Sequence, residues 1–210
     1  TAVVNIPVVD DVLALRLNAT YKDLGGWIDT INPATEETIT ESANDKQVSN
    51  LQVKGLWQAT EDLSVDVLAI QYKSDAGNDN VGSEDSERLL TVRNGLPFYS
   101  TDSSYDYNIY GLTINYDLGF ATLTSASSSF DAVQDRASNT VIATFASGLT
   151  LSGIAADVIV EIEGVAQEFR LTGMNTDIGL NWTAGLFFSK YESFIYSDVI
   201  TRYLNGVELS

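Results

Sequence analysis

Residues 178–191 read IGLNWTAGLFFSKY, and apolar side chains alternate there with small or polar ones. The apolar positions are Leu180, Trp182, Ala184, Leu186 and Phe188. A period of two is that of a β-strand, because successive side chains leave a strand on opposite faces. The stretch therefore predicts a strand with one apolar and one polar face. Either a protein core lies opposite water, or lipid lies opposite a watery lumen.

Composition excludes several classes of function. The 210 residues include 29 acidic and 11 basic ones, a net charge of −18, so the chain lacks the basic surface that nucleic acid or anionic lipid requires. Cysteine and histidine are both absent, which removes disulfides, thiolate chemistry, most transition-metal sites and triad-type catalysis. No nucleophile elbow, phosphate loop or zinc-protease motif occurs. We therefore expect no enzyme and no cofactor.

Stretches of alternating polarity recur along the whole chain. Strands are expected at about 1–7, 12–28, 49–60, 63–73, 104–117, 120–131, 165–172 and 178–191. The second of them begins VLALRLNATYK, with leucine at every other early position. In the fourth, Leu68, Ile70 and Tyr72 crowd the face that should be polar. A β-bulge that shifts the register is the interpretation we give to that stretch.

The connections between these strands alternate in length. Short links fall at about 8–11, 61–62, 118–119 and 173–177, and long ones at about 29–48, 74–103 and 132–164. Long structureless loops are uncommon in compact soluble domains, whereas transmembrane barrels combine short periplasmic turns with long extracellular loops. Strands of about ten residues also suit a tilted membrane crossing. The pattern predicts an all-β fold, an antiparallel transmembrane β-barrel segment.

Two segments within the long connections invite other interpretations. Residues 141–162 are mostly apolar, but the uncharged run from Val141 to Ala156 is shorter than the ~20 residues of a transmembrane helix. We expect an extracellular loop that folds back on the barrel mouth, in the form of an additional hairpin. The acidic segment 75–87 lacks the residue spacing of an EF-hand calcium loop, so no metal site is expected.

Four segments resemble pieces of TonB-dependent outer-membrane receptors. They are VVNIPVVDDVLALRLNATYKDLGGWIDT (3–30), DLSVDVLAIQYKSD (62–75), INYDLGFATLTSASSSFD (114–131) and AQEFRL…LNWTAGLFFSKYES (166–193). The resemblance implies a barrel of about 22 strands around an N-terminal plug. The eight expected strands are about a third of such a wall. Residues 1–210 are therefore expected to be a partial barrel domain, a fragment without the plug and the C-terminal strands.

The resemblance also implies a function and a location. Such receptors lie in the outer membrane of Gram-negative bacteria and actively take up a scarce solute such as an iron chelate, a cobalamin or a glycan. The expected partners are TonB, through the missing plug and its TonB box, the lipid of the outer membrane, and a small-molecule substrate bound by the acidic long loops. Nucleic acid is not an expected partner.

Two groups of residues are candidates for a role in such a wall. The charged side chains expected on the lumen face are Arg16, Lys22, Lys54, Glu168 and Arg170. They could pair across strands and hydrate the lumen, and the resemblance implies that they contact the plug. The aromatic residues expected at the membrane interfaces are Tyr21, Trp27, Tyr116, Trp182, Phe188 and Tyr191, with Tyr105 and Tyr107 also near a strand end.

Other classes of protein share parts of this pattern. A passive porin-type barrel has the same walls but no plug. A soluble or surface-attached β-sheet adhesion protein has the same alternation, and a second sheet would bury the face of Leu13, Leu15 and Leu17. A soluble lipid-binding barrel needs far shorter loops. The location of the leucine face therefore discriminates between these classes.

Overall fold

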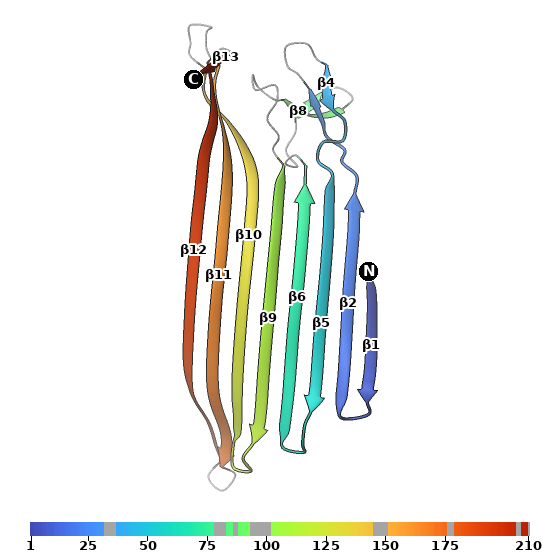
Figure 1. Cartoon of the computed structure of the whole chain (residues 1–210), viewed down its shortest axis with the longest axis vertical. Helices are drawn as coiled ribbons and strands as arrows, with labels where there is room; N and C mark the ends of the chain where they lie inside the picture. Colours follow the sequence, from blue (N-terminus) through green and yellow to red (C-terminus); the bar gives the residue numbers. More distant parts are fainter. Residues whose placement is uncertain are drawn as a thin grey trace.

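The computed structural model describes residues 1–31, 37–77, 83–85, 88–92, 102–144, 151–175, 179–204 and 207–209, and all their regular structure is β (Figure 1). The strands are β1 (Ala2–Val9), β2 (Leu13–Leu24), β3 (Asp29–Ile31), β4 (Thr38–Thr40), β5 (Lys46–Gln58), β6 (Leu63–Ala76), β7 (Ser83–Asp85), β8 (Arg88–Val92), β9 (Ser103–Asp117), β10 (Thr122–Thr144), β11 (Leu151–Asn175), β12 (Leu180–Leu204) and β13 (Val207–Leu209).

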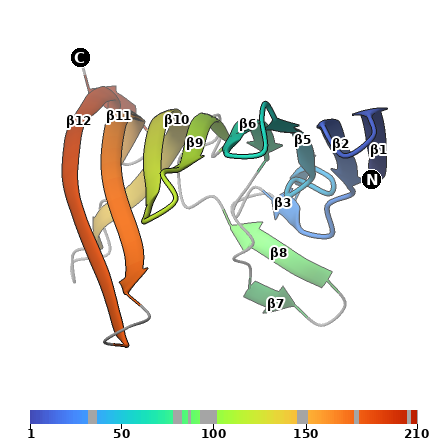
Figure 2. The same ribbon diagram turned by 90° about the horizontal axis from the view of Figure 1, so that it is seen from below.

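The main sheet contains all eight strands that the sequence predicts. Its order is β1-β2-β5-β6-β9-β10-β11-β12-β13, and every neighbouring pair is antiparallel. Each long strand therefore pairs with the long strands next to it in the chain. The sheet is curved and open, with β1 and β12 at opposite ends of the arc (Figure 2). The prediction of an all-β, antiparallel fold is confirmed, while the described strands do not close into a barrel.

The alternation of short and long connections gives the sheet two different ends. We call the end with the short links, which lies at the bottom of Figure 1, the turn end, and the opposite end the loop end. At the turn end a tight link joins β9 to β10, where Gly119 has a positive φ of 83°. The Gly119 N–H donates to the Asp117 carboxylate at 2.7 Å, and the Leu118 N–H donates to the Ala121 carbonyl at 2.9 Å.

Two of the long connections contain structure that the sequence analysis did not predict. β3 and β4 come from one connection, β7 and β8 from the other, and they form a second sheet of order β4-β3-β8-β7. Its central pair, β3 and β8, is parallel. Asn44 stabilises the entry into β3, since its buried Oδ1 accepts hydrogen bonds from the backbone N–H groups of Trp27 and Ile28 at 2.7 and 2.8 Å.

Two further expectations are wrong. Residues 132–144 and 151–164 are not part of a long loop, because β10 and β11 continue their pairing as far as Thr144 and Leu151. The described part of 141–162 belongs to this hairpin, and no described helix is long and apolar enough to cross a membrane. β6 contains no bulge, since its register with β5 and β9 runs unbroken from Leu63 to Ala76.

Few side chains of the described residues are buried. The buried apolar residues are Ile28, Ala43, Ala121 and Ala132. Leu17, Trp57 and Leu186 are instead 36%, 49% and 77% exposed. Over the described residues the long strands form a single layer, with no second sheet packed along them. A sheet of this kind has no core of its own, so its apolar side chains depend on whatever surrounds them.

Close strand packing requires a glycine in β11. A Cβ at Gly164 would lie 2.5 Å from Cε1 of Phe130 and 3.3 Å from the backbone oxygen of Lys190. At Gly111 in β9 the nearest atom to a new Cβ would be the Leu68 Cβ at 3.6 Å, an ordinary contact. Of these two positions only Gly164 is crowded, so that a methyl group there would have to displace the Phe130 ring.

We expect Gly164→Ala to lower the free energy of unfolding by about 1–3 kcal/mol, because the Phe130 ring and the neighbouring strand must shift to admit the methyl group. The matched control, Gly111→Ala, should be neutral or stabilising by up to about 1 kcal/mol, since alanine loses less conformational freedom on folding than glycine does. Urea unfolding of both variants in detergent measures the difference, and equal effects would contradict the crowding at Gly164.

Candidate functional site

The register assigns every side chain of the long strands to one of two faces, because directly paired residues of an antiparallel ladder project to the same side. We call the face of Leu13, Leu15, Leu17 and their ladder partners the Leu15 face. The opposite face, which carries Arg16 and its ladder partners, is the Arg16 face. Each name applies to the same side of every strand of the main sheet from β1 to β12.

All five charged residues predicted for the lumen lie on the Arg16 face. Arg16 and Lys54 are direct ladder partners, although like charges in such positions repel each other. Glu168 and Arg170 form an ion pair of 3.1 Å, and Lys22 lies nearer the loop end opposite Val48. The structure thus places these residues together on one face, and contact with a plug stays a prediction.

A hollow of about 540 Å³ opens beside the Arg16–Lys54 pair. Asp66 also lines it, one strand away from Lys54. No ion pair joins Arg16 or Lys54 to an acidic residue within the described ranges. An anionic group that enters this hollow would therefore relieve the repulsion between the two cations.

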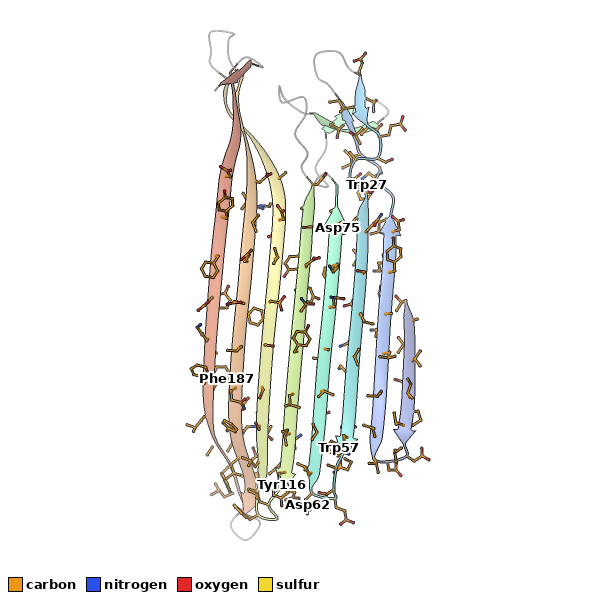
Figure 3. The ribbon with its side chains drawn as sticks, viewed as in Figure 1. Trp27, Trp57, Asp62, Asp75, Tyr116 and Phe187 are labelled. Carbon is orange, nitrogen blue, oxygen red and sulfur yellow. The ribbon has the colours of Figure 1, made fainter. Side chains whose placement is uncertain are left out.

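Most of the predicted interface aromatics share the Leu15 face. Those on this face are Tyr21, Tyr116, Trp182 and Phe188. Trp27, which follows β2, lies at the loop end, and Tyr116 lies close to the turn end (Figure 3). Tyr191 differs, because it projects from the Arg16 face, with its ring 6.2 Å from that of Phe130. Tyr105 and Tyr107 also lie on the Arg16 face.

The two faces exchange polarity along the strands. Toward the turn end the Leu15 face is mainly apolar and the Arg16 face polar, as the sequence predicts. Toward the loop end most apolar side chains are on the Arg16 face: Val48, Ile70, Tyr72, Tyr105, Tyr107, Ile109, Phe130, Ala132, Val160, Ile162, Tyr191 and Ile195. Four others, Val133, Ile159, Phe194 and Tyr196, lie on the Leu15 face among its carboxylates. Ile70 and Tyr72 therefore mark this exchange. They do not require the register shift that was expected for β6.

Toward the loop end the described acidic side chains of the long strands are confined to one face. Every described carboxylate of the long strands in this half projects from the Leu15 face: Asp23, Asp75, Asp106, Asp131, Asp135, Asp157, Glu161, Glu163, Glu192 and Asp198. Two cations pair with them, Lys73 with Asp106 at 3.4 Å and Lys190 with Glu192. On the Arg16 face the described charged residues in this half are all cations: Lys22, Lys46 and Arg136.

The acidic side chains also line an open hollow of about 670 Å³ at the loop end. Five aspartates contribute to its wall: Asp45, Asp75, Asp102, Asp135 and Asp157. Among the described residues no group of three acidic side chains is close enough to hold a metal ion. The hollow is therefore an acidic surface.

The line at which charge begins on the Leu15 face descends across the sheet. Counted from the turn end, the first charged residue on this face is Asp23 in β2 and Lys190 in β12. Following directly paired residues from strand to strand gives a ladder row. The row that contains Lys190 includes Val165 and Tyr110 and reaches β2 at Leu17, six residues before Asp23. Six strand-to-strand steps separate β2 from β12. Averaged from β2 to β12 the boundary therefore moves by about one residue per strand, although β5 itself carries no charged residue on this face.

Three tyrosines form an aromatic cluster on the Arg16 face toward the loop end. Tyr72 in β6 and Tyr107 in β9 are ladder partners, with stacked rings 4.8 Å apart and an interplanar angle of 11°. The ring of Tyr105 lies 5.7 Å from Tyr107 and 6.3 Å from Tyr72. Sequence analysis placed Tyr105 and Tyr107 at a strand end but missed the cluster. The sequence does contain a signal for the cluster. In the loop-end half of both β6 and β9, tyrosines occupy the alternate positions that belong to the Arg16 face.

No protein-family model, curated protein or solved structure matches the chain. What the protein does must therefore be argued from its residues, its register and the resemblance of its strand segments.

Proposed function

We propose that the chain is part of the wall of a TonB-dependent receptor, a β-barrel of about 22 strands in the outer membrane of a Gram-negative bacterium. In this proposal the Leu15 face contacts hydrocarbon near the turn end, and the Arg16 face lines a hydrated lumen. The loop end extends beyond the membrane, where the long connections meet a scarce solute. TonB then supplies the energy for uptake through the plug.

The observation that carries the proposal is the descending boundary of charge on the Leu15 face. One residue of offset per strand is a rise of about 3.3 Å for each ~4.8 Å across the sheet, so the boundary is inclined to the ladder rows by about 35°. Strands of outer-membrane barrels are tilted by about 35–45° to the membrane normal. A flat hydrocarbon edge cutting across tilted strands accounts for such a line.

The dimensions and exposure of the apolar band also support a membrane. On β2 the band runs from Leu13 to Tyr21, close to the about 9–11 residues of a transmembrane strand. Leu186 and Phe188 are 77% and 63% exposed, and in water such a surface would be a strong liability. An antiparallel ladder that satisfies its backbone groups from strand to strand is also what hydrocarbon demands.

The alternative classes fit these observations less well. A soluble or surface adhesion protein would cover the leucines with a second layer, and the described strands have none. It would also give no reason for the polarity of each face to reverse along the strands. A passive porin shares the wall, so it differs from the proposal in the need for a plug and for energy.

The function itself is tested by depletion of small molecules from spent growth medium, measured by mass spectrometry on cells with and without the intact protein. We expect at least one solute to be taken up only when the protein, TonB and the inner-membrane proton gradient are all present. Uptake that persists without TonB, or after addition of an uncoupler, would identify a passive pore. Loss of membrane association altogether would identify a soluble protein.

Charge placed on the two faces should have unequal effects on folding into lipid. We expect Leu15→Arg or Leu186→Arg to cost about 2–4 kcal/mol, because arginine would then lie in hydrocarbon near mid-membrane. The matched controls Thr20→Arg and Asn181→Arg, on the Arg16 face, should cost far less. Folding titrations into lipid vesicles measure both sets, and equal penalties on the two faces would contradict the lumen assignment.

Spin labels test the tilt of the strands directly. Because the sequence contains no cysteine, a single introduced cysteine is the only labelling site. Leu17→Cys and Lys190→Cys share a ladder row but lie on opposite sides of the charge boundary. We expect the label at 17 to collide mainly with oxygen dissolved in lipid, and the label at 190 mainly with a water-soluble nickel chelate. Identical accessibility at the two positions would mean that no inclined lipid edge crosses the sheet.

A further inference from the structure

The three tyrosines of the cluster form a partly exposed aromatic surface on the Arg16 face. Tyr72 and Tyr107 present nearly parallel rings, and Tyr105 beside them is 40% exposed. Within the part of the chain that the structure describes, no side-chain hydrogen bond engages any of the three hydroxyl groups. The cluster therefore offers ring faces for stacking and phenol groups for hydrogen bonding at the same place.

An arginine lies next to this surface. Tyr105 pairs with Gln134 across β9 and β10, so Arg136 is its diagonal neighbour on the same face, a spacing within reach of long side chains. Arg136 is exposed, and among the described residues it has no ion-pair partner. The described carboxylates of this half all project from the opposite face. The charge of Arg136 is thus available to a ligand.

We infer that Tyr72, Tyr105, Tyr107 and Arg136 form a binding site for an aromatic acid, a planar ring that carries a carboxylate. The ring stacks on the tyrosines, and the guanidinium of Arg136 takes the carboxylate through two parallel hydrogen bonds. Lys22 and Lys46, on the same face, add positive potential that favours an anion. Hydroxyl or methoxy groups of the ligand can bond to the free tyrosine hydroxyls.

The chemistry of the site favours this occupant over others. A neutral glycan would stack on the tyrosines but gain nothing from Arg136. An aliphatic acid would use Arg136 but not the ring faces. The combination of a stacked pair with an unpaired guanidinium selects a ligand that has both groups. The assignment deepens the proposed function and depends on it for access from outside the cell, although binding can be measured independently of transport.

Isothermal titration of the intact protein in detergent micelles tests the assignment. The probe is 4-methoxybenzoate, compared with 4-methoxybenzamide, which lacks the charge, cyclohexanecarboxylate, which lacks the aromatic ring, and maltotriose. We expect 4-methoxybenzoate to bind at least tenfold more tightly than each comparison compound. Binding of the amide or of the aliphatic acid with equal affinity would overturn the assignment, as would the absence of binding.

Variants locate the site. Arg136→Gln and Tyr107→Leu should each weaken binding of 4-methoxybenzoate at least tenfold. The control Lys73→Gln changes a cation next to Tyr72 in the chain, but on the Leu15 face, and should leave affinity unchanged. If Tyr107→Leu lowers only the urea midpoint and not the affinity, the cluster is a packing surface and the assignment is wrong. Recognition of an aromatic ligand only as a ferric catecholate complex would also overturn it.

Failure of this inference can be told apart from failure of the proposed function. Selective binding of 4-methoxybenzoate without energy-dependent uptake would support the aromatic-acid site and contradict the transport function. TonB-dependent uptake of some solute by a protein that does not bind 4-methoxybenzoate would support the transport function and contradict the aromatic-acid site.

Discussion

Everything in this structure depends on the strand-to-strand ladder, because the long strands have almost no core. Hydrogen bonds between neighbouring strands and cross-strand side-chain contacts hold the layer together, while both of its faces remain accessible. The hydrophobic effect normally supplies most of the stability of a folded domain. Here it requires a surrounding medium that accepts Leu17, Trp57 and Leu186. In the proposal that medium is lipid.

The exchange of polarity shows that each strand is adapted to two environments in succession. Near the turn end the Leu15 face is apolar, and near the loop end the same face carries the carboxylates. On the Arg16 face the order is reversed, and tyrosine and isoleucine replace the polar residues. In the proposal, a water-exposed outer surface above the membrane accounts for the first change, and an interior suited to partly apolar ligands or loops accounts for the second.

Much of the fold could be predicted from the sequence because an alternating pattern is a local property. All eight long strands were found in this way, and so were the short turns, including the one at Gly119. The second sheet could not be found, since β3 and β8 belong to different connections and their pairing leaves no local period. The extension of β10 and β11 was missed because serine-rich and uniformly apolar stretches alternate weakly. The five lumen candidates lie on one face, as expected, whereas Tyr191 lies on the face opposite Tyr21, Tyr116, Trp182 and Phe188.

The order of strands in the main sheet has a consequence for how such a wall is assembled. Each long strand forms its ladder with the strands next to it in the chain, so no partner has to be recruited from a distant segment, and contacts of this kind form rapidly. Hairpins of neighbouring long strands can therefore form locally and then join along their edges. Each strand already in place offers a free edge to the long strand that adjoins it in the chain.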